Sequence, residues 1–275
     1  MKFNSKFLLI LIVLISFSCN QDKELKPLRS SQKQIEMTTS YGKMVIELYD
    51  ETPLHRDNFI NLVKHGAYDS LLFHRVIKEF MIQGGDPDSK TAKVNDTLGE
   101  GDAPYVVKAE FNKDLFHKKG VLAAARDDRP DRASSGMQFY LVQGKVFNDS
   151  LLDKVESYIN KNNAVTYFKN RSQQKPLVNA IDTAILNRNI EKYKILRDSV
   201  LSLAKSEAAF KSHAISESQR EAYRTLGGTP HLDQNYTVFG EIIEGIEVLD
   251  SIAGVETNDL DRPLNDLRIL KVSLI

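Results

Sequence analysis

The sequence predicts a mainly β protein: a closed antiparallel barrel of about eight strands, capped by two helices and interrupted by a helical insertion. Short apolar runs with strand patterning recur from residue 34 to the C-terminus, with polar loops between them. Only two segments among these runs have helical patterning, a mixture typical of a closed antiparallel barrel. The stretch from about residue 145 to residue 226 departs from this rhythm and repeats its apolar residues at helical spacing.

The first strands and the first helix follow directly from the pattern. Residues 35–39 and 44–48 follow the alternation of a strand, and Gly42 lies in the turn-forming segment between them, which predicts a β-hairpin. A helix then opens at Thr52 and ends at Gly66. Its apolar face carries Phe59, Leu62 and Val63.

The remaining elements outside the insertion are short. Five apolar runs predict strands, and one segment near the C-terminus predicts a helix. In chain order the strand runs cover residues 71–77, 120–125, 137–142, 236–243 and 267–275, and the helix covers residues 245–254.

The insertion is predicted to consist of helices. Ser150 with Asp153 and Ser216 with Gln219 have the spacing of capping boxes, and Gly227 marks a helix end. An amphipathic stripe recurs every three or four residues, at Leu186, Ile190, Tyr193, Leu196, Val200 and Leu203. This stripe packs either on its own domain or on a separate partner, and the sequence leaves both alternatives open.

Composition excludes several classes of protein. The 275 residues are 41% apolar and 27% charged, as in soluble globular proteins, which excludes a mostly disordered chain. Because 37 basic residues balance 37 acidic residues, no basic field attracts nucleic acid. The Gly84-Gly85 pair fits no nucleotide-binding pattern, and no His-Glu-x-x-His motif occurs. We therefore expect no metal, no other cofactor and no nucleic-acid partner.

The N-terminus has the features of an exported lipoprotein. An apolar run at residues 7–17, preceded by two lysines, is too short to span a bilayer as a helix and is typical of a secretory signal. Ser18 and Cys19 follow, an arrangement that resembles the lipobox at which bacterial lipoproteins are cleaved and acylated. We expect residues 1–18 to be a signal peptide and Cys19 to be a lipidated membrane anchor. A plain secretory signal and an uncleaved anchor remain as alternatives.

The rest of the chain divides into two regions. Residues 19–33 are polar, charged and broken by Pro27, which predicts a flexible tether. Residues 34–275 are expected to form one folded domain that contains the insertion. The lipoprotein signal predicts that this domain lies in the cell envelope, facing the periplasm or on the outer membrane.

One arginine is unusual in its surroundings. Arg75 lies inside an apolar run, where a buried guanidinium is costly unless it is paired or used. Strand alternation would place Phe73 and Ile77 on the face of Arg75, and His74 and Val76 on the other face. Taken alone, the pattern also fits an arginine whose stem packs on the protein while its head reaches solvent.

The segment around Arg75 resembles the signature of the cyclophilin-type peptidyl-prolyl isomerases. Ten positions match this signature: Phe73, His74, Arg75, Ile77, Phe80, Met81, Gln83, Gly84, Gly85 and Asp86. Residues 34–144 and 227–275 agree with the family in the order and spacing of their motifs, including "SSGMQFYLV" and "GGTPHLDQNYTVFGEIIEG". The resemblance implies a cyclophilin-like β-barrel and the activity of a peptidylprolyl isomerase.

The residue types suit this reaction. Rotation about an X-Pro bond must break amide resonance, over a barrier of roughly 18–20 kcal/mol. As resonance is lost, the prolyl nitrogen gains a free lone pair to which a fixed guanidinium can donate. An apolar cup that holds the proline ring lets the acyl side rotate, so the reaction needs neither a nucleophile nor a cofactor.

The resemblance also implies which residues form the site. Arg75 would be the catalytic donor, Gln83 would hydrogen-bond and orient it, and Phe80 would complete the catalytic group. The cup for the proline ring would consist of Phe80, Met81, Tyr140, Leu232 and Tyr236, with a tyrosine hydroxyl at 140 where the family has phenylalanine. The peptide groove would be lined by Ala125, Arg126, Gln138 and His231, the last at a position where many members carry tryptophan.

These features predict an isomerase that acts on proline-containing polypeptides of the envelope and assists their folding. We expect the protein to be a monomer. One alternative is a chaperone or scaffold lipoprotein that grips proline peptides with little catalysis. In another, the insertion docks an envelope partner and the barrel serves as its carrier.

Overall fold

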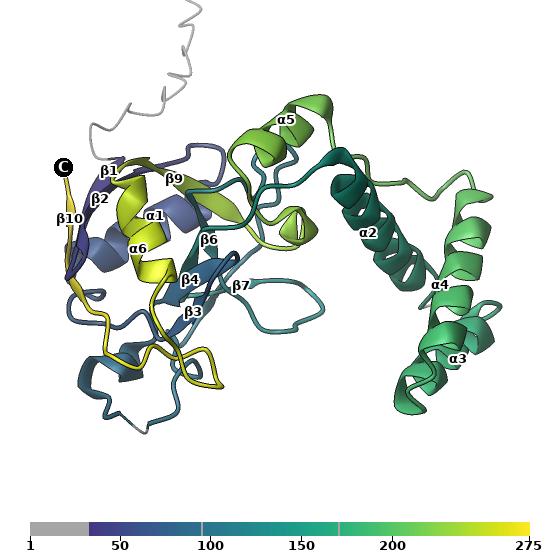
Figure 1. Cartoon of the computed structure of the whole chain (residues 1–275), viewed down its shortest axis with the longest axis horizontal. Helices are drawn as coiled ribbons and strands as arrows, with labels where there is room; N and C mark the ends of the chain where they lie inside the picture. The colour runs from purple at the N-terminus through teal and green to yellow at the C-terminus, as the bar shows by residue number, and fades with distance from the viewer. Residues whose placement is uncertain (1–32, 95, 170) are drawn as a thin grey trace, which may run out of the picture. The chain divides into compact units, whose positions relative to one another are not determined.

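The computed structural model describes residues 33–94, 96–169 and 171–275. The predicted signal peptide, Cys19 and nearly all of the predicted tether lie outside these residues. Eight strands form the main sheet, in the order β10-β1-β2-β9-β6-β8-β4-β3, and every neighbouring pair is antiparallel (Figure 1). The strands are β1 (Gln34–Thr39), β2 (Gly42–Leu48), β3 (Arg75–Ile77), β4 (Met81–Gly84), β6 (Val121–Ala124), β8 (Phe139–Val142), β9 (Val238–Glu244) and β10 (Ile269–Leu274), with β5 (Val106–Val107) and β7 (Ser134–Ser135) in a separate ribbon.

The main sheet is an open half-barrel, so the prediction of a closed barrel is wrong. Its end strands are β3 and β10, and no ladder joins them within the described residues. The segment before β3 meets the start of β10, where Ser70 and Leu71 exchange main-chain hydrogen bonds with Ile269. In β3 itself the N–H of Val76 donates to the carbonyl of Asp261, a loop residue before β10, in a stretch where Pro263 has no N–H to offer a ladder.

Two helices pack against this sheet. α1 (Pro53–Lys64) lies against β9 and β10, and α6 (Ile246–Ala253) lies against β2, β3 and β4. Because the sheet is open, it has no closed ends for these helices to cap. Their buried apolar faces complete the main core, with Phe59 and Val63 from α1 and with Leu249 and Ile252 from α6.

The strand predictions are confirmed in part. In the predicted hairpin, Thr39 pairs with Gly42 at the turn, and the apolar side chains of β1 and β2 are buried in the main core. The sequence patterns missed β4, β5 and β7. β3 is also shorter than the predicted run 71–77, so Phe73 does not share the face of Arg75: Phe73 lies in the main core, whereas Arg75 is exposed.

Four α-helices lie between β8 and β9. Three of them, α2, α3 and α4, share a small apolar core that includes Phe168, Ile181 and Val200. The predicted stripe is not continuous, since Leu186 and Ile190 are exposed beside the turn that separates α3 from α4. No helix within the described ranges has the length and apolarity that a membrane crossing needs. The α-helices of this region are α2 (Asp149–Lys169), α3 (Lys175–Leu186), α4 (Ile190–Lys205) and α5 (Glu217–Thr225). The 3-10 helix η2 (Pro230–Leu232) follows them before β9, and η1 (Pro87–Thr91) lies between β4 and β5.

Short polar side chains cap the starts of α2, α4 and α5, whereas α3 has no side-chain cap. At α5 the predicted capping box is confirmed: the hydroxyl of Ser216 accepts from the N–H of Gln219, whose side chain accepts from the N–H of Ser216. At α2 the prediction of Ser150 with Asp153 is wrong. The side chain of Asn148 accepts the N–H of Leu151 at 2.9 Å, because asparagine is as good an N-cap as serine and lies two residues earlier.

The insertion leaves and rejoins the sheet at one point. Lys145 and Gly228 exchange two main-chain hydrogen bonds, of 3.0 and 3.3 Å. Gly227 follows α5 with a φ of +86°, as expected of a helix end, and Gly228 has a φ of +152°. A Cβ on Gly228 would collide with the carbonyl oxygen of His117 and lie 2.7 Å from the ring of Tyr223. This close approach requires glycine.

Gly228→Ala is therefore expected to lower the free energy of unfolding by about 2 kcal/mol or more, because it combines an unfavourable φ with a main-chain clash. Urea unfolding followed by circular dichroism measures the change. Gly254→Ala is the matched control, since Gly254 has a φ of −89° and its new Cβ would meet the nearest atom at 3.3 Å. Equal stability of the two variants would contradict the crowding at Gly228.

His74 is buried directly before β3, and neither ring nitrogen has a hydrogen-bond partner among the described residues. Burial lowers the pKa of His74 to about 4, since a charged ring is poorly solvated there. Asp86 opposes this shift, whereas Arg75 and Arg262 add to it. The folded protein therefore keeps the ring neutral at pH values where the unfolded chain protonates it.

We expect the free energy of unfolding to be highest above about pH 6.5 and to fall between pH 6.5 and pH 4. In this window the unfolded chain takes up a proton that the folded state excludes, and His74 accounts for about 3 kcal/mol of the loss. His74→Phe should remove this part of the slope in urea titrations at pH 7 and pH 4. If wild type and variant lose stability equally, His74 is not its source.

Candidate active site

A hollow of about 140 Å³ lies where β3, β4 and β8 meet the loops after β6 and around η2. Two predicted residues adjoin it: Gln138 accepts a hydrogen bond from Gln83 at 2.9 Å, and the ring of His231 stacks on Phe80 with 5.6 Å between centroids. The structure thus brings together all the residues that the sequence assigned to catalysis and substrate binding. The hollow itself is lined by Arg75, Phe80, Met81, Gln83, Ala125, Arg126, Tyr140, Leu232 and Tyr236.

The floor of the hollow is apolar. Met81 and Tyr140 are buried there, and Phe80, Leu232 and Tyr236 pack beside them with part of their surface exposed. These side chains rest on a second small core, formed by Val121, Ala123, Val142 and Val238. This cluster is separate from the main core and gives the hollow a preformed surface that suits a small saturated ring.

Arg75 supplies a positive charge at the rim. It lies opposite Gln83 in the β3–β4 ladder, and its side chain is 45% exposed. Its Nε donates to the carboxylate of Asp261 at 3.3 Å, and it makes no other hydrogen bond with a described residue. The Nη donors of the guanidinium make no hydrogen bond with a described residue, so they stay available to a ligand in the hollow. The ion pair between Nε and Asp261 is weak at this exposure.

The expected contact between Gln83 and Arg75 is not formed. The side-chain amide of Gln83 donates to Gln138, whose own amide donates to two main-chain carbonyls of the loop 99–101, both at 2.8 Å. Asp261 takes the place of Gln83 as the partner of Arg75. Sequence reasoning missed Asp261, since a loop residue 186 positions away along the chain carries no local signal.

A second guanidinium, that of Arg126, borders the hollow but is engaged by the protein. Its Nε donates to the carbonyl of Asn235 at 2.8 Å, and its Cζ lies 4.7 Å from the centroid of the Tyr236 ring. These contacts make Arg126 a wall of the site. Arg75 is the less engaged of the two, since only its Nε donates to a described residue.

Tyr140 belongs to a buried hydrogen-bonded chain that sequence reasoning also missed. Its hydroxyl lies 2.9 Å from Nε2 of His117, and Nδ1 of the same ring lies 2.9 Å from Asp233. The other oxygen of Asp233 accepts from the hydroxyl of Tyr223, in α5, at 2.7 Å. Burial raises the pKa of Tyr140 well above its usual value, so the hydroxyl stays protonated. The hydroxyl that was expected in the cup is therefore engaged inside the protein.

His231 forms a neutral wall of the site. Burial lowers the pKa of its ring, and the nearby His117 acts in the same direction, with Asp233 opposing both. The ring is therefore uncharged near neutral pH, and its stack on Phe80 adds apolar surface to the cup.

The geometry suits electrostatic chemistry. The hollow combines a permanently charged donor at its rim with an apolar floor, and none of its lining residues is a serine, cysteine or lysine. A donor placed in this way can stabilise a lone pair that develops on a ring held against the floor.

Comparison with known proteins identifies the family of the chain. The chain matches the family described as "Cyclophilin type peptidyl-prolyl cis-trans isomerase/CLD" over residues 34–168 and 157–274. A Staphylococcus saprophyticus protein named as a peptidyl-prolyl cis-trans isomerase is 28% identical over 240 residues, which cover 87% of this chain and 90% of that protein. A Streptococcus pyogenes protein named as a bifunctional phosphatase/peptidyl-prolyl cis-trans isomerase is 29% identical over 86% of this chain, which spans only 37% of that longer protein.

A solved structure agrees on the fold. The crystal structure of a Cryptosporidium parvum cyclophilin-type peptidyl-prolyl cis-trans isomerase, in the presence of the dipeptide Ala-Pro, has a TM-score of 0.51 and 18% identity to this chain. The likeness covers 88% of this chain and 98% of that one, and at such low identity it shows the fold alone. Since the family match extends over nearly all of the described residues, the chain belongs to the cyclophilin-type peptidyl-prolyl cis-trans isomerase family.

Proposed function

We propose that the hollow beside Arg75 carries the peptidyl-prolyl cis–trans isomerase activity of this chain, and that its substrates are X-Pro bonds of envelope polypeptides. The observation that supports this assignment is the place of Arg75, whose available donors stand at the rim of an apolar floor formed by Met81 and Tyr140. The Ala-Pro dipeptide present with the Cryptosporidium parvum protein supports a proline ring as the occupant.

In the proposed mechanism, binding fixes the proline ring and leaves the acyl side mobile. Phe80, Met81 and Leu232 hold the ring on the floor, while Ala125 and Arg126 border the path of the peptide backbone. Because the hydroxyl of Tyr140 is already engaged by His117, the floor offers the proline ring an apolar surface. The acyl group can then rotate about the C–N bond against a fixed proline.

The catalytic step depends on an interaction that exists only in the twisted amide. In the planar ground state the prolyl nitrogen shares its lone pair with the carbonyl group and accepts poorly. At the top of the barrier the lone pair is free, and the guanidinium of Arg75 donates to it. An interaction made only in the transition state raises kcat, and one such donor contributes about a hundredfold to a thousandfold in rate. Asp261 orients the guanidinium in the role that was expected of Gln83.

We also propose that the protein acts as an exported lipoprotein at the cell envelope. The support is in the sequence, where an apolar run of signal-peptide length ends at a small residue and at Cys19, the chain's one cysteine. Residues 19–33, which the sequence predicts to be a flexible tether, would link the folded domain to this anchor, within reach of newly exported polypeptides.

Arg75→Ala is expected to lower kcat/KM on a proline tetrapeptide by about a hundredfold or more, because it removes the donor to the prolyl nitrogen. A protease-coupled isomerisation assay measures the loss. Arg129→Ala is a matched control, since Arg129 is also 45% exposed and paired with an aspartate, Asp131, but lies outside the hollow. Equal turnover of Arg75→Ala and wild type would favour the alternative in which the hollow only binds proline peptides.

Cys19→Ser is expected to move the protein from the membrane fraction to the soluble fraction and to abolish labelling by radioactive palmitate, because no thiol remains to be acylated. Cell fractionation and metabolic labelling test this. A wild-type protein that carries no label would reject the lipid anchor and favour a plain secretory signal or an uncleaved one.

A further inference from the structure

A second groove, of about 500 Å³, adjoins the proline hollow. The ring of Phe80 lines both spaces, and His231, stacked on Phe80, lines the groove. Two rings with centroids 5.6 Å apart therefore separate the hollow from the groove. Because Phe80 lines both spaces, a polypeptide bound in the hollow reaches the groove once its chain passes this ring.

The far wall of the groove comes from the insertion. Phe147 and three residues of α2, Leu151, Val155 and Tyr158, present apolar side chains to it. The α2 residues are spaced four and three apart, so they lie on one face of the helix. Leu151 is 38% exposed and Tyr158 is 50% exposed, so this wall offers apolar surface that a ligand can bury.

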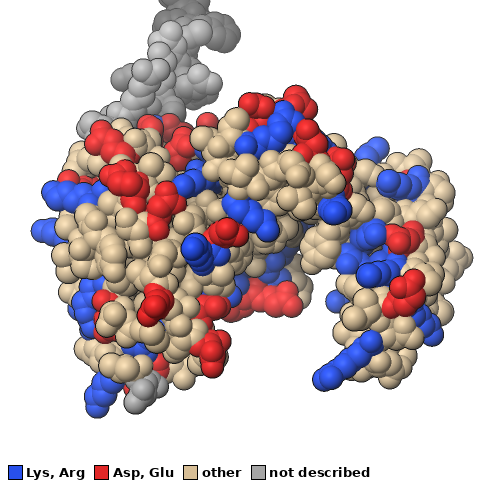
Figure 2. Space-filling view, viewed as in Figure 1, with Lys and Arg blue, Asp and Glu red and all other residues tan. Residues whose placement is uncertain are grey.

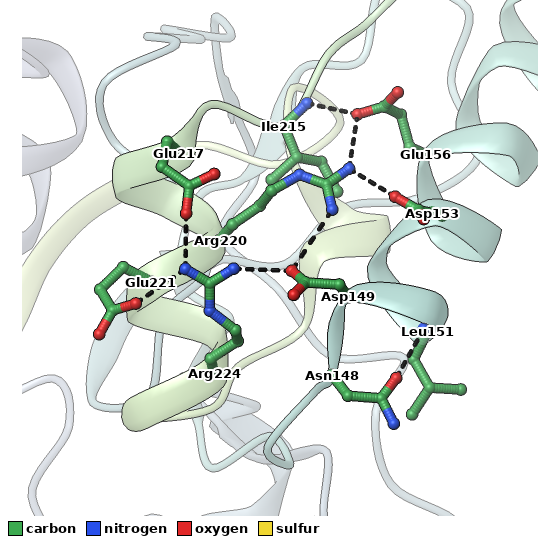
Figure 3. A network of polar contacts seen from close by, with 10 residues as sticks. All are labelled: Asn148, Asp149, Leu151, Asp153, Glu156, Ile215, Glu217, Arg220, Glu221 and Arg224. Atoms are coloured by element: carbon green, nitrogen blue, oxygen red, sulfur yellow. Dashed lines mark hydrogen bonds and ion pairs between the residues drawn. The ribbon is translucent and has the colours of Figure 1, made fainter.

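The opposite face of α2, about 200° around the helix, is fixed to α5 by ion pairs (Figure 3). Arg220 binds Asp153 at 2.8 Å and Glu156 at 3.4 Å, and Arg224 binds Asp149 at 2.7 Å. Acidic and basic side chains crowd together over these helices in Figure 2. Because networks of several charges are stronger than isolated surface pairs, α2 is held with its apolar face toward the groove.

The helix α5 is joined in turn to the floor of the proline hollow. Tyr223 donates to Asp233, and Asp233 binds His117, the partner of Tyr140. The groove and the hollow thus share one support, and both are open in this structure. A single polypeptide can contact both without a rearrangement of the protein.

Positive charge borders the groove. Lys145 and Lys154 line it, and neither forms an ion pair with a carboxylate in the part of the chain that the structure describes. Glu79 is the one acidic side chain among the described residues of the lining. The Nζ of Lys145 lies 5.8 Å from the centroid of the Phe147 ring, so a cation stands beside the apolar wall. This arrangement suits a ligand that carries an apolar side chain next to a carboxylate.

We propose that the groove binds the segment of the client polypeptide next to the proline and selects an apolar residue with an acidic neighbour. This inference deepens the proposed function and rests on it, because the hollow must hold the proline for the flanking residues to reach the groove. Continuity across the stack of Phe80 and His231 favours a substrate segment over a separate protein partner.

The test compares kcat/KM for a proline tetrapeptide with values for the same peptide extended by Leu-Glu, Leu-Lys or Gly-Ser, in separate series on each side of the proline. In the wild type, Leu-Glu is expected to exceed Gly-Ser by about tenfold on one side, through a lower KM, because the leucine is buried on the wall. Leu-Glu should exceed Leu-Lys by about threefold, the size expected of an exposed ion pair.

Substitutions in the lining of the groove test whether these kcat/KM ratios arise there. Leu151→Ala is expected to shrink the advantage of Leu-Glu over Gly-Ser, and Lys154→Glu to reverse the order of Leu-Glu and Leu-Lys. Lys169→Glu makes the same charge change on an exposed residue of α2 that lies outside the groove, so it should leave every ratio unchanged.

The outcomes separate the two proposals. If the wild type does not turn over the unextended tetrapeptide, the proposed function fails. If it does, but the extensions change kcat/KM by less than about twofold on both sides, the groove is not a substrate site and the inference is overturned. The inference is also overturned if Leu151→Ala and Lys154→Glu keep the wild-type ratios, since the preference for the Leu-Glu extension then arises outside the groove.

Discussion

The carboxylate of Asp233 is buried, and the site and the insertion both depend on it. An ionised carboxylate is unfavourable away from water unless its oxygens are hydrogen-bonded. Asp233 meets this condition through the ring and the main-chain N–H of His117 and through the hydroxyl of Tyr223. Tyr140 completes the chain from the other side of His117. The floor of the hollow, the segment before β6 and helix α5 therefore have one common support. Loss of His117 or Tyr223 leaves the buried carboxylate short of a partner, and loss of Tyr140 leaves a ring nitrogen of His117 without one.

The parts that the sequence predicted well are those with local causes. The first hairpin, α1 and α6 follow from alternation, helical spacing and turn residues, which act over a few positions. The capping box of Ser216 and Gln219 needs only three residues of separation. The site residues converge because the signature places Arg75, Met81 and Gln83 on two neighbouring strands, so a short motif determines most of the geometry.

The parts that the sequence missed depend on residues far apart or on elements too short to show a period. Asp261 reaches Arg75 across 186 positions, and His117 reaches Asp233 across 116. β5 and β7 have two residues each, which is too few for alternation to be recognised, and in β4 the apolar run is broken by Gln83 and Gly84. Whether the barrel closes depends on the irregular path of the chain before β10, and no pattern within β3 reveals that path.

The paired hydrogen bonds between Lys145 and Gly228 have an evolutionary consequence. A segment whose two ends already meet adds only a slowly growing closure entropy as it lengthens, and it shifts no strand register in the host sheet. Lineages that share this half-barrel can therefore acquire, trim or exchange the helices between β8 and β9 without disturbing the catalytic rim. Because α2 also walls the groove beside the proline hollow, the proposed substrate role of the groove means that each such exchange would alter which sequences are accepted while the rotation chemistry is inherited unchanged.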